Sequence, residues 1–421
     1  MTVASTACPI SDAERRIVII GGGYAGTTLA VRLGRALKRH PRPGVEVLLL
    51  ETSPCQQALS ELDLVAAGSE RPEFCELWLP AVLKDLPVRT CFNRAESIDC
   101  VRRVVTIKGG QEVDYWRLVV ASGAVPSMPP VPGLAEHAIT MWSVADAQRL
   151  QMRIREQAKL AAAMPYAEDR RRALSVTVCG GGATGVEIVG TLGQLLPKRA
   201  AEVGLDPSDL NIHLVEGRTS ILYDLPETQR EKAAARLAKL GVDVVTGSMV
   251  AGVDDERVLL ADGREVASAV LVWCGGAKAD PHAAVWGFTL DNGGRIVTDT
   301  DGKAHGLDDV YALGDVASFR SQRTNRVLPM LAQFAITSAE HASGNLLAEI
   351  DGRLTTPFAP SQHGEFVSVG PSWGVGWMFG LKLSGFPAIF MKRLTYVLYW
   401  WQVGGIPLAW KRGRELLSMQ R

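Results

Sequence analysis

The sequence predicts an α/β protein with two parallel-sheet domains, one inserted into the other, followed by a separate C-terminal region. Three observations lead to this prediction. A β-branched run, a glycine-rich turn and a helix-like segment occur together twice, in IVIIGGGYAGTTLA (17–30) and VTVCGGGATGVE (176–187). Each copy is followed by a second apolar run that ends in an acid. Beyond residue 366, tryptophan and basic residues become frequent, which indicates a region of another kind.

Length and composition agree with a multidomain globular protein. The chain has 421 residues, of which 47% are hydrophobic and 21% charged, so two or three domains with ordinary cores are expected. The formal net charge is zero, which gives no general attraction to nucleic acid. The seven cysteines include no C-x-x-C pair, so we expect neither a metal site nor a secreted disulfide framework. Residues 1–14 lack the apolar core of a signal peptide and are predicted to be a disordered leader.

The glycine-rich turns have the spacing G-x-G-x-x-G. In this pattern a strand leads into a tight turn, and the helix that follows places its N-terminus against a pyrophosphate. A single occurrence is a weak signal, because many turns are rich in glycine. Here both copies have the strand before and the helix after, which predicts two Rossmann-type dinucleotide sites. The glycines concerned are Gly21, Gly23 and Gly26 in the first copy, and Gly180, Gly182 and Gly185 in the second.

An acid ends the next strand after each turn, as ribose binding requires. Glu51 ends GVEVLLLE, and Glu216 ends NIHLVE. A carboxylate at this position accepts from a ribose 2′-hydroxyl and repels a 2′-phosphate, so Glu216 favours NADH over NADPH. Arg218, two residues later, is expected to soften that preference.

Two dinucleotides in one chain suggest a relay, with FAD held permanently and NADH delivering hydride to it. In two-dinucleotide flavoproteins, an A-S-G segment closes the FAD domain and a later Gly-Asp segment completes it. Ser122 and Gly123 belong to the first segment, and Gly314 and Asp315 to the second. The first turn is therefore assigned to FAD and the second to NADH. A helix N-cap is the other role open to Asp315.

At this point the chain resembles the type II NADH dehydrogenases, single-subunit NADH:quinone oxidoreductases. The motifs span about residues 15–370 and include GGGYAG, GGGATGVE, WCGGAKADP, DDVYALGDVA and LPMLAQFA. The resemblance implies FAD and NADH as cofactors, a non-proton-pumping transfer to quinone, and no catalytic cysteine pair. It also implies that Glu187 helps to seat the nicotinamide beside the flavin, and that Gly276 and Lys278 belong to the NADH site.

One motif departs from the family pattern. The quinone motif A-Q-x-A-x-Q-x-[GA] reads AQFAITSA here, so Gln333 is kept while Thr337 replaces the second glutamine. Residues four apart share a helix face, and threonine reaches less far. The acceptor is therefore left open between a quinone and a soluble small molecule, in a biosynthetic pathway for example. A flavin-bound redox sensor that does not oxidise NADH continuously is a third possibility. The intact motifs of the NADH site, including Glu187 and the GGAKADP segment, argue against it.

The C-terminal region has the composition of an interfacial helix. Its apolar run FPAIFMKRLTYVLYWWQVGGIPLAW is broken by charges, glycines and a proline, and is too short to span a bilayer. We expect it to attach the protein to the cytoplasmic side of the cell membrane, or to form a homodimer interface in a cytoplasmic protein. From residue 381 there is one acid, Glu415, and seven basic residues: Lys382, Lys392, Arg393, Lys411, Arg412, Arg414 and Arg421.

The expected domain organisation follows from these assignments. Residues 15–140 and 291–365 form the FAD domain, 141–290 the inserted NADH domain, and 366–421 the C-terminal region.

Overall fold

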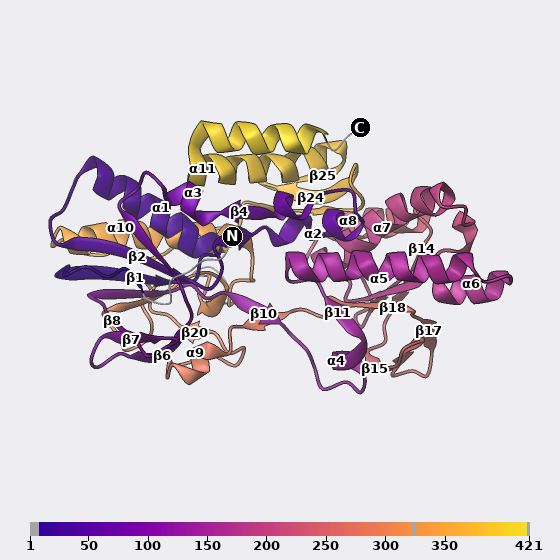
Figure 1. The fold of residues 1–421 in the computed structure, drawn as a ribbon, viewed down its shortest axis with the longest axis horizontal. Coiled ribbons are helices and arrows are strands. Elements are labelled where there is room, and N and C mark those ends of the chain that lie inside the picture. Colours follow the sequence, from indigo (N-terminus) through magenta and orange to yellow (C-terminus); the bar gives the residue numbers. More distant parts are fainter. Residues whose placement is uncertain (1–7, 322–325, 419–421) are drawn as a thin grey trace.

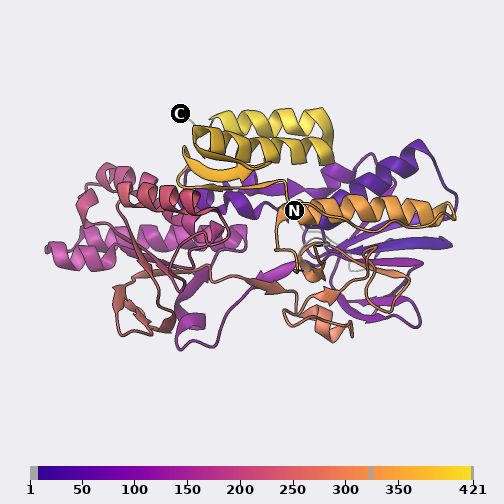
Figure 2. The same ribbon diagram turned by 180° about the vertical axis from the view of Figure 1, so that it is seen from behind.

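The computed structural model describes residues 8–321 and 326–418. It has two α/β lobes side by side, and the C-terminal helices lie above the junction between them (Figure 1). Figure 2 shows from behind that helix α10 (Ala332–Ile350) returns late in the sequence to cover the first lobe.

The first lobe is built on a five-stranded sheet in the order β21-β9-β1-β2-β5, in which every pair is parallel. Its central strand is buried from Arg16 to Ile20, as expected for a parallel strand covered on both faces. Helix α1 (Tyr24–Arg39) packs beside α10, and a three-stranded antiparallel sheet covers the opposite side (Figure 1). The strands are β1 (Arg15–Ile20), β2 (Val45–Glu51), β5 (Val88–Phe92), β6 (Ala95–Asp99), β7 (Val104–Ile107), β8 (Glu112–Asp114), β9 (Arg117–Val120) and β21 (Val310–Ala312).

The second lobe repeats this plan, in the strand order β11-β18-β12-β13-β14. All of its neighbouring strands are again parallel, and a small antiparallel sheet is attached. The strands are β11 (Ala138–Thr140), β12 (Ser175–Cys179), β13 (Asn211–Glu216), β14 (Val242–Thr246), β15 (Val250–Val253), β16 (Arg257–Leu260), β17 (Glu265–Ala267) and β18 (Val270–Trp273). The helices are α5 (Val144–Ala162), α6 (Ala167–Ala173), α7 (Ala183–Glu202) and α8 (Glu227–Lys239).

Two short strands carry the chain between the lobes. Strand β10 (Ala124–Pro126) leads out of the first lobe, and β19 (Ala277–Ala279) leads back, and the two pair antiparallel. Strand β11 already belongs to the second sheet, so the boundary expected at 141 lies too late. The segment 281–290 likewise packs with the first lobe, where Leu290 bridges to Ile296. The A-S-G segment comes directly before β10, so the sequence marked the first crossing, whereas the pairing of β10 with β19 joins residues far apart in the chain.

The segment after β2 reaches across to the second lobe. Helix α2 (Leu62–Ala66) contacts both α5 and α7. The segment's remaining elements are β3 (Cys55–Gln57), η1 (Leu59–Glu61), η2 (Pro72–Cys75), β4 (Glu76–Trp78) and α3 (Leu79–Leu83). The other short elements of the chain are α4 (Leu134–His137), η3 (Pro207–Asp209), α9 (His282–Val285), β20 (Ile296–Val297), η4 (Gly314–Val316) and β22 (Ala317–Ser318).

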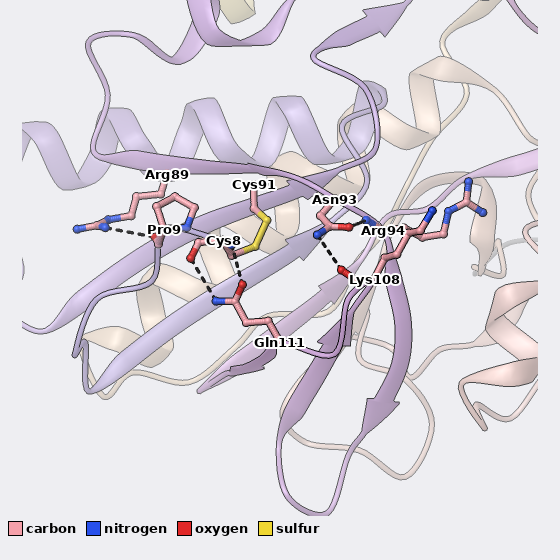
Figure 3. The surroundings of a disulfide bond; sticks show 8 residues. All are labelled: Cys8, Pro9, Arg89, Cys91, Asn93, Arg94, Lys108 and Gln111. Carbon is pink, nitrogen blue, oxygen red and sulfur yellow. Dashed lines mark hydrogen bonds between the residues drawn. A yellow bond between two sulfur atoms is a disulfide. The ribbon is translucent and has the colours of Figure 1, made fainter. Parts of the chain in front are cut away.

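The N-terminal segment is attached to the first lobe by a disulfide between Cys8 and Cys91 of β5 (Figure 3). Cys8 is only 5% exposed, and its backbone N–H donates to Gln111 Oε1 at 2.7 Å. The expected disordered leader is therefore wrong for residues 8–14, while residues 1–7 lie outside the described part. The bond joins residues 83 positions apart, and spacing alone could not pair them.

The C-terminal region begins as an antiparallel sheet of β23 (Gly364–Ser368), β24 (Gly374–Met378) and β25 (Leu381–Gly385). Element α11 (Phe386–Ser418) follows as two helices that meet at Gly405, whose φ of 69° breaks the helical path. The two helices run antiparallel across the junction of the lobes (Figure 1). Within the described residues, no helix is long and apolar enough to cross a membrane.

Part of the expected basic face of this region points inward. Lys392 is 7% exposed, and Arg412 donates to the backbone carbonyls of Glu73 and Phe74. Arg393 donates to the carbonyl of Pro371 at 2.7 Å. These three were expected to be surface anchors, which is wrong, because each instead satisfies groups of the protein. Lys382, Lys411 and Arg414 are exposed, and Arg421 lies outside the described residues.

Candidate functional site

The first glycine turn joins β1 to α1 and has the geometry of a phosphate cradle. Gly21 has φ 103°, and a Cβ there would lie 2.3 Å from the carbonyl oxygen of Ala121. A Cβ at Gly26 would lie 1.8 Å from the carbonyl oxygen of Gly21. At Gly23, the N-cap of α1, an added Cβ would meet nothing within 4 Å. The first and third glycines are thus required by the protein itself, and the second leaves open space at the helix N-terminus, where a phosphate binds.

The second turn, between β12 and α7, has the same geometry. Gly180 has φ 116°, and its Cβ would lie 2.2 Å from the carbonyl oxygen of Cys274. A Cβ at Gly185 would lie 1.9 Å from the carbonyl oxygen of Gly180, whereas Gly182, the N-cap of α7, again faces open space. The chain therefore contains two equivalent cradles.

The acids at the ends of β2 and β13 bind the cradles in the same way. Glu51 Oε2 accepts from the backbone N–H of Gly22, and its Oε1 accepts from that of Thr52 at 2.6 Å. Glu216 Oε2 accepts from the N–H of Gly181 at 2.6 Å, and its Oε1 from that of Arg218 at 2.8 Å. Each carboxylate is thus held beside the turn, in the position that a ribose-binding acid requires.

The A-S-G and Gly-Gly-Ala-Lys segments meet at the crossing between the lobes. Ser127 donates its backbone N–H to the carbonyl of Gly276 at 2.9 Å, and Asp280 donates to the carbonyl of Gly123 at 3.1 Å. Ser122 Oγ is buried without a hydrogen-bond partner among the described residues. Lys278 is exposed on β19. A buried hydroxyl without a partner is costly in a protein interior, so Ser122 fits a site that a polar ligand completes.

The Gly-Asp segment lies in η4, at the carboxyl end of β21. The backbone N–H of Gly314 donates to Ser338 Oγ of α10 at 3.2 Å, which joins this turn to the helix of the quinone motif. Burial raises the pKa of Asp315, and the charge of Arg295 opposes that rise. A partly desolvated carboxylate here suits a ligand rich in hydroxyl groups.

The motif residues of α10 are already hydrogen-bonded. Gln333 Nε2 donates to the carbonyl of Ser361 at 2.8 Å. The Thr337 hydroxyl donates to the carbonyl of Gln333, one turn earlier in its own helix, at 2.9 Å. The two side chains therefore do not form the pair of polar groups that two glutamines would present. Threonine hydroxyls commonly bond back to the preceding turn in this way.

Glu187 in α7 is paired with a residue that the sequence did not suggest. Lys392 Nζ donates to Glu187 Oε1 at 2.5 Å and to Ser368 Oγ at 2.9 Å. The Ser368 backbone N–H donates to the same Glu187 oxygen at 3.1 Å. Lys392 lies in the apolar run of the C-terminal region, where a basic residue indicates a surface anchor. Its burial depends on α11 folding back over the junction.

Two further acids surround this pair, Glu61 of η1 and Asp63 of α2. Glu61, Asp63, Glu187 and Lys392 are called the junction cluster below. Burial raises the pKa of Glu61 to about 7 and that of Asp63 to about 6, and the charge of Lys392 opposes both shifts. Burial alone would lower the pKa of Lys392, but the three carboxylates outweigh it and raise that pKa. The sequence gave no signal for this cluster, because its members come from three separate regions.

Aromatic residues connect the C-terminal region with the first cradle. The ring of Tyr24, the first residue of α1, lies 4.8 Å from that of Tyr399 in α11. Tyr399 donates its hydroxyl to Gln56 at 2.8 Å. The C-terminal region therefore contributes directly to the surroundings of the site.

Cys179 and Cys274 lie beside the second cradle, and both are free thiols. The disulfide Cys8–Cys91 lies beside Gln111, at the outer edge of the first sheet (Figure 3). Burial raises the pKa of Cys179 to about 12, which keeps its thiol protonated and unreactive.

Comparison with known proteins agrees with this arrangement. The model of the pyridine nucleotide-disulphide oxidoreductase family matches residues 15–339. A type II NADH:quinone oxidoreductase of Staphylococcus aureus (strain NCTC 8325 / PS 47) is 28% identical over 405 residues, which cover 95% of this chain and 99% of that protein. The resemblance predicted from the motifs is therefore confirmed.

Two solved structures show the same fold. NDH2 from Plasmodium falciparum in complex with NADH superposes with a TM-score of 0.83 at 14% identity, covering 96% of this chain and 97% of that one. A sulfide:quinone oxidoreductase from Aquifex aeolicus superposes with a TM-score of 0.75 at 16% identity, covering 93% and 92%. With the family model matching most of its length, the chain belongs to the pyridine nucleotide-disulphide oxidoreductase family.

Proposed function

We propose that this protein is an FAD-dependent NADH:quinone oxidoreductase that does not pump protons. The observation that carries the proposal is the pair of equivalent cradles, joined by the antiparallel strands β10 and β19. One dinucleotide can then face the other across the crossing between the lobes. The type II NADH:quinone oxidoreductases that match nearly the whole chain support the same reaction.

The first cradle is assigned to FAD. Gly21, Gly23 and Gly26 leave the backbone open to the pyrophosphate, and Glu51 is placed for the ribose hydroxyls. At the end of the proposed FAD site opposite the cradle, Ser122 supplies a buried hydroxyl and Asp315 a partly desolvated carboxylate. When bound, the flavin supplies the chemistry that takes hydride from a nicotinamide and passes electrons to an acceptor.

The second cradle is assigned to NADH. Gly180, Gly182 and Gly185 take the pyrophosphate, and Glu216 takes the adenosine ribose. Lys278 lies in β19, the strand that leads back toward the first cradle, and Gly276 directly precedes this strand. Glu187, which Lys392 and Ser368 hold by hydrogen bonds, is assigned to orient the nicotinamide against the flavin.

The acceptor site is assigned to the start of α10, beside Gly314. Gln333 and Thr337 lie one turn apart there, and Ser338 binds the Gly-Asp turn. A quinone is proposed here because the type II NADH:quinone oxidoreductases match nearly the whole chain. A soluble acceptor is the alternative that threonine at position 337 leaves open in the sequence, and the quinone oxidoreductases that match the chain do not favour it.

The exposed face of α11 is assigned to a membrane surface. Its outward side carries Phe386, Phe390, Leu398, Trp401, Ile406 and Trp410, each about half exposed or more. Lys411 and Arg414 flank this face. Aromatic side chains beside basic residues are typical of peripheral attachment on the cytoplasmic side of a membrane. A homodimer partner is the alternative that would cover the same face.

Anaerobic stopped-flow measurement tests the proposal. The yellow protein is reduced with one equivalent of NADH and then mixed with a soluble short-chain quinone, while flavin absorbance is followed. Fast bleaching followed by fast quinone-dependent recovery is expected. Fast bleaching with sluggish recovery would contradict the quinone assignment and favour a soluble acceptor. Absence of bleaching would contradict the NADH assignment itself.

A further inference from the structure

A cavity of about 220 Å³ lies in the second lobe, among helices α2, α5, α6 and α7. It borders the starts of strands β12 and β18, whereas the second cradle follows the end of β12. None of the cradle glycines lines it, so the cavity is separate from both proposed dinucleotide sites. Its volume exceeds the roughly 150 Å³ of an engineered apolar cavity that holds benzene, and a small organic molecule therefore fits.

The cavity remains open because small side chains surround it. Protein interiors are close-packed and leave few voids larger than a water molecule, so an open space of this size is unusual. Leu174, Leu196 and Leu210 add to the wall and make it largely apolar. The small residues are Ala66 and Ala67 at the end of α2, Ala158 of α5, Ala173 of α6 and Ala200 of α7.

One polar side chain is buried in this apolar wall. Gln157 of α5 lines the cavity and is 9% exposed. Its amide takes part in no hydrogen bond with the residues that the structure describes. Buried amides in proteins nearly always have a partner, because an unpaired one keeps the cost of leaving water. Gln157 therefore points to a polar group of a molecule inside the cavity.

The open side of the cavity carries a net positive charge. Its charged lining residues are Arg155, Arg199 and Glu202, which sum to one positive charge. Arg155 and Glu202 are exposed, and Arg199 is half-buried, where it donates to the carbonyl of Gly68 at 2.7 Å. Neither guanidinium forms an ion pair with a carboxylate of the described residues, so both are available to an anionic group.

We propose that this cavity is a binding site for a small apolar carboxylate of the medium-chain fatty acid class. The alkyl chain lies against the alanine and leucine side chains, where its burial releases water. The carboxylate accepts hydrogen bonds from Arg155 and Arg199, and the Gln157 amide donates to the same group. Because α2 belongs to the segment that reaches across from the first lobe, the ligand contacts elements of both lobes.

Calorimetric titration of the full-length, FAD-loaded protein with octanoate tests the inference. We expect saturation at one octanoate per chain. Octylammonium has the same chain with the opposite charge, and it should bind at least about tenfold more weakly because the guanidinium groups repel it. Equal affinity for the two molecules, or uptake that does not saturate, would show adsorption to apolar surface and overturn the inference.

Two variants on α5 locate the binding. Ala158→Leu fills the cavity and should abolish octanoate binding, whereas Ala162→Leu, one turn later at an exposed position outside the lining, should leave it unchanged. Arg155→Met should raise the Kd of octanoate by about three- to tenfold, as expected for a charge-assisted contact near solvent. Lys159→Met, also exposed on α5, is its control. Unchanged binding in Ala158→Leu, or equal losses in a variant and its control, would contradict the site.

Photolabelling of the unaltered protein gives a readout that does not depend on the folding of a variant. An octanoate that carries a diazirine at its terminal carbon should label peptides from 150–158 and 196–205. Excess unlabelled octanoate should prevent this labelling. Labels found elsewhere, on the exposed face of α11 above all, would overturn the inference. The outcome is independent of the proposed function, because neither NADH nor a quinone is present.

Discussion

Lys392 of α11 donates a 2.5 Å hydrogen bond to Glu187 of α7, and the two residues lie 205 positions apart. The contact joins the C-terminal region to the helix that follows the second cradle. Because both side chains are buried, removing either leaves a charge without its partner. The C-terminal region is therefore a part of the site as well as a candidate attachment surface.

Lys392→Met should destabilise the fold by about 3–5 kcal/mol, the usual cost of removing one partner of a buried ion pair. The loss should be larger at pH 8 than at pH 6, because the junction carboxylates can neutralise themselves by taking up protons at lower pH. Thermal unfolding at both pH values measures this. Lys382→Met, at an exposed position of β25, is the control and should change little. Equal losses in the two variants would contradict the buried pairing.

Gly26→Ala and Gly185→Ala should separate the two cradles. An added Cβ would lie 1.8 Å and 1.9 Å from backbone oxygens, so each turn must distort. Gly26→Ala should be purified without FAD, whereas Gly185→Ala should keep FAD and lose its reduction by NADH. Flavin absorbance followed by NADH titration measures both effects. Gly344→Ala, on the exposed face of α10 with nothing near its Cβ, is the control. If Gly185→Ala lost FAD while Gly26→Ala kept it, the assignment of FAD to the first cradle and NADH to the second would be reversed.

Glu216→Ala should raise the KM for NADH by roughly ten- to hundredfold, as expected for a lost hydrogen bond of about 1.5–3 kcal/mol to a charged group. The preference over NADPH should narrow at the same time, because the repulsion of a 2′-phosphate is removed. Steady-state kinetics with both dinucleotides measures this. Unchanged discrimination would contradict the role given to Glu216.

Arg218→Ala complements that experiment. The Arg218 guanidinium lies 4.8 Å from the centre of the Tyr223 ring, close behind Glu216. If the Arg218 guanidinium accommodates the 2′-phosphate of NADPH, Arg218→Ala should bind NADPH less well, and the preference for NADH should widen.

Trp401→Ser combined with Trp410→Ser should weaken binding to vesicles that contain anionic lipid by at least about tenfold, since each exposed indole contributes roughly 1.5–3 kcal/mol when buried. Sedimentation with liposomes measures this. Val101→Ser, at a 95% exposed position of the first lobe, is the control. Unchanged sedimentation together with a shift from dimer to monomer would assign the face to a second copy. Deleting the region is a poor test, because Tyr399, Trp400 and Val403 are buried in the core.

The sequence by itself determined the two cradles. Gly21, Gly26, Gly180 and Gly185 could be identified because the turn is local: the strand, the glycines, the helix and the acid at the end of the next strand all follow each other in the chain. The two sheets could be predicted for the same reason, since the period of the apolar residues in a strand is a local property.

Only the tertiary structure decided what surrounds the cradles. Lys392 reads as a surface anchor within its own segment, and it becomes a buried partner of Glu187 because α11 folds back across both lobes. Glu61 and Asp63 read as ordinary acids, and their raised pKa values come from burial among residues of α7 and α11. The pairing of Cys8 with Cys91 and the crossing at β10 and β19 likewise depend on contacts between distant segments. Burial and charge are properties of the assembled neighbourhood, so no local pattern in the sequence carries them.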